Sequence, residues 1–174
     1  MKTRISLFLV LLAFLATAAF SQEKTRKQLK EEQKLEKQKQ VEAMVNAKDF
    51  VFVARMANPT GMKSVNLATN PNYLMFKPEM IESEMPYFGK AYNSVGYGGD
   101  AGLKFKGKPE EFTVTKGKKN FDIKVIVKET SDKYTLYLSV SFEGSTTLSV
   151  NSNNRSNISY SGEISAPEKP EEKK

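Results

Sequence analysis

Apolar and polar residues alternate along the C-terminal half of this chain, and the alternation predicts β-strands. From Phe121 to Lys128, and again from Tyr134 to Phe142, every second residue is apolar. This pattern places apolar side chains on one face of a sheet and polar side chains on the other. Short turns separate the segments and leave no room for a crossover helix, so the strands must be antiparallel. Ile126 and Tyr137 fall on the polar face, where we expect the N-terminal helix to cover them locally.

Upstream of the strands, the apolar spacing becomes helical. Val41, Met44 and Val45 fall at positions i, i+3 and i+4, which form one face of a helix. Residues 22–40 are mostly Lys, Glu and Gln, which favour a helix but leave no apolar face to bury. We therefore predict a helix from Arg26 to Ala47, whose first half projects as a charged stalk and whose second half docks on the domain.

These patterns together predict an α+β fold, in which an N-terminal helix precedes an antiparallel β-meander sheet of about six to eight strands. A single domain is expected over residues 41–165, after the charged helical stalk of residues 22–40. Residues 166–174 are almost entirely Pro, Glu and Lys, and contain no apolar group that could offset the entropy of ordering. They are predicted to form a disordered tail.

The first residues have the pattern of a removable export signal. Lys2 and Arg4 precede an unbroken apolar run of ten residues, Leu7 to Ala16, which is too short to anchor a helix in a bilayer. Ala19 and Ser21 supply the small residues that a signal peptidase reads. Residues 1–21 are therefore predicted to be a signal peptide. We expect an exported protein that does not span the membrane after cleavage and that resides in the periplasm or outside the cell.

The amino-acid composition excludes several kinds of catalytic and metal-binding groups. The chain has neither Cys nor His, which removes thiolate nucleophiles, imidazole acid–base catalysis and the usual zinc ligands. Of 27 basic residues, two lie in the signal, so the mature chain carries 25 basic against 20 acidic residues, a net charge of +5. An exported protein rarely meets nucleic acid, so we expect no nucleic-acid partner. No cofactor, metal or catalytic residue is predicted.

The segment Met85 to Phe105 does not have the pattern of a regular structural element of the fold. It contains five glycines and three tyrosines and follows neither the helical nor the strand period. A long irregular loop in a compact domain is often functional. Tyr87, Tyr92 and Tyr97 could stack on a ligand and Asp100 could orient it, although these aromatic rings could instead pack on the sheet.

A second irregular segment, Asn151 to Asn157, is rich in Asn and Ser and surrounds Arg155. Asn and Ser favour turns, so a polar hairpin loop is the simplest interpretation. Arg155 suggests a second interpretation, in which the segment binds an anionic group. A guanidinium group binds carboxylate or phosphate in a forked geometry that Lys cannot match. Asp100 is its natural internal partner.

These two segments carry a resemblance to a known family. The stretches Pro86 to Tyr92 and Tyr97 to Phe105 resemble the signature of secreted Gram-negative proteins grouped as domain of unknown function 4251. Phe50 to Phe52, Val150 to Arg155 and Ile158 to Gly162 extend the match to roughly residues 40–164. The chain departs from that signature at Lys90 and at residues 95–97. The family has no established activity, so the resemblance implies compartment and domain extent.

Three functions are compatible with these observations. The first is a non-catalytic cell-envelope protein that binds a glycan, peptide or lipid fragment through Tyr87, Tyr92, Tyr97 and Asp100, with Arg155 nearby. The second is envelope assembly or scaffolding through an unknown protein partner, with the stalk and the sheet edges as contacts. The third, which the lack of His and Cys disfavours, is a hydrolase that uses Asp100 with Glu110 or Glu111. The oligomeric state does not follow from the sequence.

Overall fold

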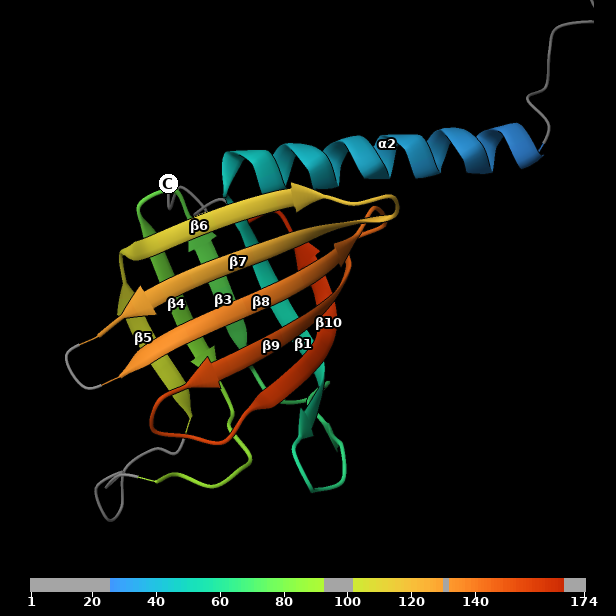
Figure 1. Ribbon diagram of the computed structural model, residues 1–174. Helices are drawn as coiled ribbons and strands as arrows, with labels where there is room; N and C mark the ends of the chain where they lie inside the picture. The colour runs from blue at the N-terminus through green and yellow to red at the C-terminus, as the bar shows by residue number, and fades with distance from the viewer. Residues whose placement is uncertain (1–25, 93–101, 130–131, 168–174) are drawn as a thin grey trace, which may run out of the picture. The chain divides into compact units, whose positions relative to one another are not determined.

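The computed structural model describes residues 26–92, 102–129 and 132–167 (Figure 1). The described residues belong to two compact units, one ending at Leu35 and the other beginning at Glu36. The predicted signal, residues 1–21, lies outside the described residues, as does the predicted tail from residue 168 onward. Everything that follows on packing concerns the second unit.

Helix α2, Arg26–Ala47, has the bounds that the sequence predicts. Val41 and Val45 are completely buried and Met44 packs partly against the core, as the i, i+3, i+4 spacing requires. The helix ends where Lys48 adopts a left-handed backbone with φ of 55°. The Lys48 and Asp49 amides donate to the carbonyls of Val45 and Met44, which caps the last turn.

Within the described residues, ten strands follow the helix and form one antiparallel sheet. Their alternating burial confirms the alternation in the sequence. The sheet contains more strands than the predicted six to eight. The strands are β1 Phe50–Pro59, β2 Val65–Asn66, β3 Tyr73–Lys77, β4 Met80–Met85, β5 Leu103–Gly107, β6 Pro109–Lys116, β7 Asn120–Lys128, β8 Lys133–Ser141, β9 Ser145–Ser152 and β10 Ile158–Ser165.

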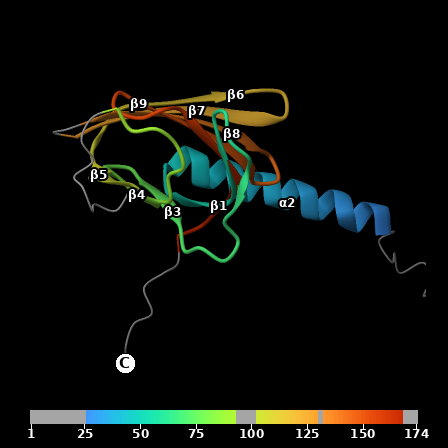
Figure 2. The ribbon, with the colours of Figure 1, turned by 90° about the horizontal axis from the view of Figure 1, so that it is seen from below.

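The strand order is β5-β4-β3-β1-β10-β9-β8-β7-β6, with β2 added beside β1. The order departs from a plain meander, because the first long strand pairs with the last one, from Val51 opposite Ser165 to Pro59 opposite Ile158. This pairing joins a β3–β5 meander to a β6–β10 meander. The resulting sheet is strongly curved and nearly closed, and its two meanders face each other as layers (Figure 2).

The core lies between these layers. Phe76 of β3 meets Phe112 of β6 edge to face, with ring centroids 6.1 Å apart. Phe105 of β5 stacks on Tyr134 of β8, with centroids 4.3 Å apart. Aromatic contacts of this kind add to the free energy gained by burying the rings. They hold the two layers together.

A break in the β1–β10 register lies between Ala54 and Met56. Gly162 faces this irregularity. A Cβ atom placed on Gly162 would collide with the carbonyl oxygen of Val53 and would lie 2.9 Å from the Ala54 Cα. Bulges of this type bend a strand and increase its twist. The glycine therefore permits the close backbone contact at which the sheet turns from one layer into the other.

Candidate functional site

Two segments far apart in the sequence are joined at one end of the sheet. Ala91 and Arg155 form an isolated antiparallel bridge. On either side of it, the Tyr92 amide donates to the Asn154 carbonyl at 2.8 Å, and the Ser156 amide donates to the Lys90 carbonyl at 2.9 Å. These hydrogen bonds fix the backbone of residues 90–92 against residues 154–156. We call this region the Tyr87–Arg155 end, comprising residues 86–92 and 152–157.

The Tyr87 side chain is the centre of this junction. It is buried, and its hydroxyl lies 3.0 Å from the Lys90 carbonyl, 2.9 Å from the Ser156 carbonyl and 2.9 Å from Ser156 Oγ. The Ser156 Oγ in turn accepts a hydrogen bond from the Lys90 amide. Gly89 makes room for this arrangement, since a Cβ there would lie 2.5 Å from the Tyr87 hydroxyl. One tyrosine hydroxyl thus ties together both segments.

Arg155 lies over the ring of Tyr87, with its Cζ 5.0 Å from the ring centroid. A guanidinium in this position is attracted to the electron-rich face of the ring. Below them, the completely buried Tyr160 donates its hydroxyl to the Pro86 carbonyl at 2.7 Å. Burial raises the pKa of Tyr160, and the charge of Arg155 opposes that rise only in part. The phenol therefore stays protonated and keeps Pro86 in place.

Asp132 fixes the start of the segment of residues 152–157 by hydrogen bonds. Its carboxylate is buried and accepts hydrogen bonds from Ser152 Oγ at 2.6 Å, from the Asn153 amide at 3.1 Å and from its neighbour, the Lys133 amide, at 2.8 Å. Burial, and next the charge of Asp132, raise the pKa of the adjacent Tyr134 to about 12. A buried carboxylate supplied with three donors organises the loop that carries Arg155.

Tyr92 contrasts with the other tyrosines of this end. Its side chain is 65% exposed, although its backbone is fixed by the hydrogen bond to Asn154. A shallow hollow of about 270 Å³ lies at the start of this segment, where Met85, Pro86, Gly102 and Lys104 are among its lining residues and Tyr92 is not. An exposed ring on a fixed backbone is the arrangement that suits stacking on a ligand.

The structure brings together three of the five predicted site residues, namely Tyr87, Tyr92 and Arg155. Tyr97 and Asp100 lie outside the described residues. Sequence reasoning missed Asp132, Ser156 and Tyr134. Asp132 lies between strands β7 and β8 together with a second acid, Glu129, and nothing in the sequence distinguishes the two. Ser156 could not be distinguished from the other serines of its loop.

The carboxylates of the alternative hydrolase hypothesis are bonded to lysines where the structure describes them. Glu111 accepts hydrogen bonds from Lys124 Nζ at 2.9 and 3.0 Å, and the pKa of Glu111 is lowered chiefly by this hydrogen bond. Glu110 lies 4.0 Å from Lys133 Nζ. A general acid needs a raised pKa, so Glu111 is poorly suited to that role. Asp100, the other acid of the hypothesis, is outside the described residues.

In the parts of the chain that the structure describes, no cluster of three or more Asp, Glu, His or Cys residues could hold a metal ion. Over the same ranges, none of the helical sequence is long and apolar enough to cross a membrane.

Fold and site together define a class: a nearly closed antiparallel sheet, preceded by one helix, with a tyrosine–arginine junction at one end. The chain belongs to the family described as a domain of unknown function, DUF4251, whose model matches residues 32–164. It also shares its fold with a DUF4251 family protein from Bacteroides eggerthii DSM 20697, known from a crystal structure. The two have a TM-score of 0.58 and 17% sequence identity, over 75% of this chain and 87% of that one. No curated protein matches the sequence.

Proposed function

We propose that this protein is an exported, non-catalytic cell-envelope protein that binds a glycan, peptide or lipid fragment at the Tyr87–Arg155 end. The observation that carries the proposal is the contrast between Tyr87 and Tyr92. Tyr87 is buried and uses its hydroxyl to fix the backbone, while Tyr92, five residues later, holds its ring in solvent on that fixed backbone. Export rests on the predicted signal of residues 1–21.

A fixed backbone matters because binding must otherwise overcome the entropy of ordering a loop. The hydrogen bonds of Tyr87, Ser156 and Asp132 meet that cost during folding. The Tyr92 ring offers a flat apolar surface, and the hollow beside Pro86 offers a place for an adjacent group of the ligand. Asp100 and Tyr97 are proposed to complete the contacts from the neighbouring segment.

A thermal-shift screen of the mature protein, residues 22–174, tests the proposal. The panel contains envelope glycans, muropeptides, lipids and Ca²⁺. A ligand at 100 times its dissociation constant adds about 2.7 kcal/mol to the free energy of unfolding, which gives a readily measured rise in Tm. We expect Tyr92→Ala to remove the shift and leave the unliganded Tm nearly unchanged. The exposed Met62, on the turn after β1, provides the control variant Met62→Ala.

A ligand whose shift survives Tyr92→Ala would place binding elsewhere and contradict the proposal. An absence of any shift across the panel would instead favour the assembly function. Crosslinking in cells would then be the next measurement, and recovery of an envelope protein joined to this one would support assembly.

A further inference from the structure

The outer face of the sheet differs in chemistry from one pair of strands to another. On β4 and β5 the outward side chains are charged and paired across the strands, with Lys104 Nζ 3.3 Å from Glu84 and Lys106 Nζ 2.8 Å from Glu82. On β8 and β9, by contrast, every outward side chain from Thr135 to Ser141 and from Ser145 to Asn151 is Ser, Thr, Tyr or Asn. We call this second surface the hydroxyl face.

Strand propensity does not account for the hydroxyl face. Thr and Tyr favour strands, but Ser does not belong to the residues enriched there. Solubility does not account for it either, since charged residues serve that purpose and the outward positions of β4, β5 and β7 carry them. Ser139, Ser145 and Ser149 at outward positions of β8 and β9, in a chain with 27 basic and 20 acidic residues, therefore require another explanation. The hydroxyl of the fourth serine, Ser141, is buried.

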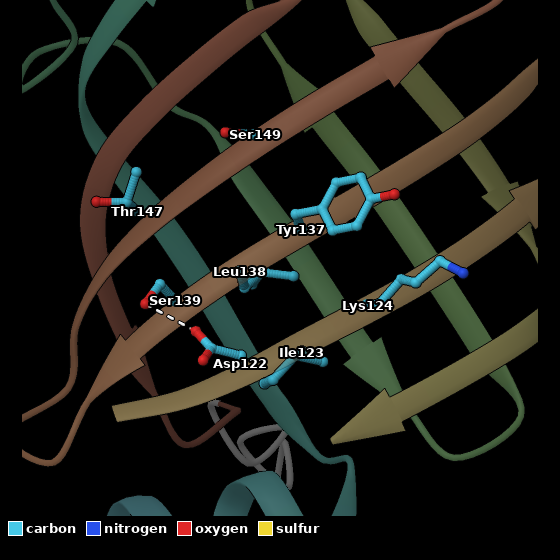
Figure 3. Close-up of a pocket in the computed structure, with 8 residues that line it drawn as sticks. All are labelled: Asp122, Ile123, Lys124, Tyr137, Leu138, Ser139, Thr147 and Ser149. Atoms are coloured by element: carbon cyan, nitrogen blue, oxygen red, sulfur yellow. Dashed lines mark hydrogen bonds between the residues drawn. The ribbon is translucent and has the colours of Figure 1, made fainter. Parts of the chain in front are cut away.

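The strand register arranges these side chains in rows. Lys124 of β7 lies opposite Tyr137 of β8, which lies opposite Ser149 of β9. In the next row, Asp122 lies opposite Ser139, and Ser139 opposite Thr147. Together they border an open groove of about 330 Å³. Figure 3 shows Tyr137 at its centre, between Lys124 and Ser149. The volume is within the range of small-molecule sites, about 300–1,000 Å³.

The charged side chains at the border of the groove already have hydrogen-bonding partners within the protein. Lys124 Nζ is hydrogen-bonded to both oxygens of Glu111. Asp122 accepts hydrogen bonds from Ser139 Oγ at 3.1 Å and from the Asn120 side chain at 2.6 Å (Figure 3). A charged ligand would have to break these pairs, whereas a neutral polar ligand would leave them intact. The groove thus favours a neutral partner.

Tyr137 supplies the apolar part of the surface. The sequence pattern predicts that this side chain is covered, yet it is 44% exposed. A tyrosine ring can stack on the C–H face of a sugar ring, while Ser and Thr hydroxyls both donate to and accept from sugar hydroxyls. A flat lattice of hydroxyls around one aromatic ring matches a chain of neutral sugars better than it matches an ionic or a wholly apolar ligand.

We infer that the hydroxyl face binds a neutral polysaccharide, with Tyr137 as its stacking residue and Ser139, Thr147 and Ser149 as hydrogen-bonding residues. This site lies on the outer face of β7–β9 and shares no residue with the Tyr87–Arg155 end. It therefore goes beyond the proposed function, and either site can fail its test while the other passes.

Affinity electrophoresis of the purified protein in native gels tests the inference. The gels contain a soluble neutral polysaccharide: hydroxyethyl cellulose, galactomannan, arabinoxylan, laminarin or dextran. Carboxymethyl cellulose serves as the charged counterpart of hydroxyethyl cellulose, since both have the same backbone. We expect at least one neutral polysaccharide to retard the protein. We expect Tyr137→Ala to weaken the apparent affinity by about tenfold or more, as loss of a central aromatic anchor does.

Three variants make the result specific. Tyr137→Phe keeps the ring and should retain most of the retardation. Thr147→Lys places a long charged side chain at an exposed position in the groove and should abolish it. Tyr73→Ala removes a tyrosine from the outer face of β3 in the other layer and should leave retardation unchanged. Thermal unfolding of each variant confirms that it is folded.

Four outcomes would overturn the inference. One is the absence of retardation by every neutral polysaccharide. A second is equal retardation of the wild type and the Tyr137→Ala variant. A third is stronger retardation by carboxymethyl cellulose than by hydroxyethyl cellulose. The last is concentration-dependent self-association of the protein that Thr147→Lys abolishes, which would assign the hydroxyl face to a second copy of the chain.

Discussion

The hydroxyl of Tyr87 and the Oγ of Ser156 lie 2.9 Å apart, although 69 residues separate them in the sequence. The same tyrosine hydroxyl also reaches the carbonyls of Lys90 and Ser156. Ser156 Oγ also accepts a hydrogen bond from the Lys90 amide, so the two hydroxyl groups together join the two segments of the candidate site. The geometry of the Tyr87–Arg155 end therefore depends on these two hydroxyl groups in addition to the backbone hydrogen bonds between residues 90–92 and 154–156.

Tyr87→Phe removes the phenolic oxygen and keeps the ring beneath Arg155. We expect the free energy of unfolding to fall by about 1–3 kcal/mol, because buried polar groups lose a hydrogen-bonding partner. Urea denaturation measures the change. Tyr92→Phe is the matched control, since its side chain is 65% exposed, and it should change stability by less than about 0.5 kcal/mol. Equal effects of the two variants would contradict the role given to Tyr87.

Gly162→Ala tests the close contact between β1 and β10. A Cβ at this position collides with the Val53 carbonyl and approaches the Ala54 Cα, and neither backbone atom can move aside cheaply. We expect a loss of about 3 kcal/mol or more in the free energy of unfolding. The neighbouring exposed Ser161 gives the control Ser161→Ala, which should be nearly neutral. A Gly162→Ala variant with the Tm of the wild type would contradict the close approach.

The raised pKa of Tyr134 predicts that the free energy of unfolding falls at high pH. Burial, then the charge of Asp132, raise its pKa from 10.0 to about 12 in the folded protein. The folded state thus holds the phenolic proton more tightly than the unfolded state does. The resulting stabilisation is fully present below pH 10 and is lost as the pH rises towards 12. Urea denaturation at pH 9, 10, 11 and 12 follows this loss.

The Tyr134→Phe variant should lose less stability than the wild type across that pH interval, because it has no phenol to ionise. Part of the loss should remain, since burial also raises the pKa of Tyr160. Spectrophotometric titration at alkaline pH provides a second measurement of the tyrosines. If wild type and Tyr134→Phe lose stability equally from pH 9 to 12, the environment assigned to Tyr134 is wrong.

Export makes a prediction about processing. Cleavage after Ser21 should leave a mature protein that begins at Gln22, which mass spectrometry of the purified protein detects. Ala19→Asp places a charge at one of the two positions that signal peptidase reads, and should cause the uncleaved precursor to accumulate. Cell fractionation then distinguishes periplasmic from extracellular protein. A mature chain that still begins at Met1 would contradict the predicted signal.

Local patterns in the sequence predicted the local elements well. The helix from Arg26 to Ala47 followed from a charged stretch that runs into a 3.6-residue apolar period, and its bounds are confirmed. Strands β7 and β8 followed from strict alternation, which leaves only one way to bury the apolar residues. In both cases the signal lies within a few neighbouring residues.

Long-range pairing was not predictable in this way. Nothing near Val51 indicates that its partner is Ser165, since the match depends on the whole sheet closing. The same applies to Tyr87, whose burial depends on Ser156 and on the bridge between Ala91 and Arg155. The hydroxyl face is a different case. The alternate Ser and Thr residues are visible in the sequence, but only the structure shows that they form one surface and that the outward side chains of β4 and β5 are charged instead.

The pairing of the first and last long strands determines where the chain enters and leaves the sheet relative to the candidate site. The chain enters the sheet at Phe50 and leaves it at Ser165, which pairs with Val51, so the two ends of the sheet's chain path lie side by side. Strand β10 begins at Ile158, immediately after the loop that holds Arg155, and runs away from that loop to Ser165. A partner that holds the protein through the residues before β1 or after β10 is therefore connected to one end of the sheet. Tyr92 lies at the opposite end, where its side chain is exposed.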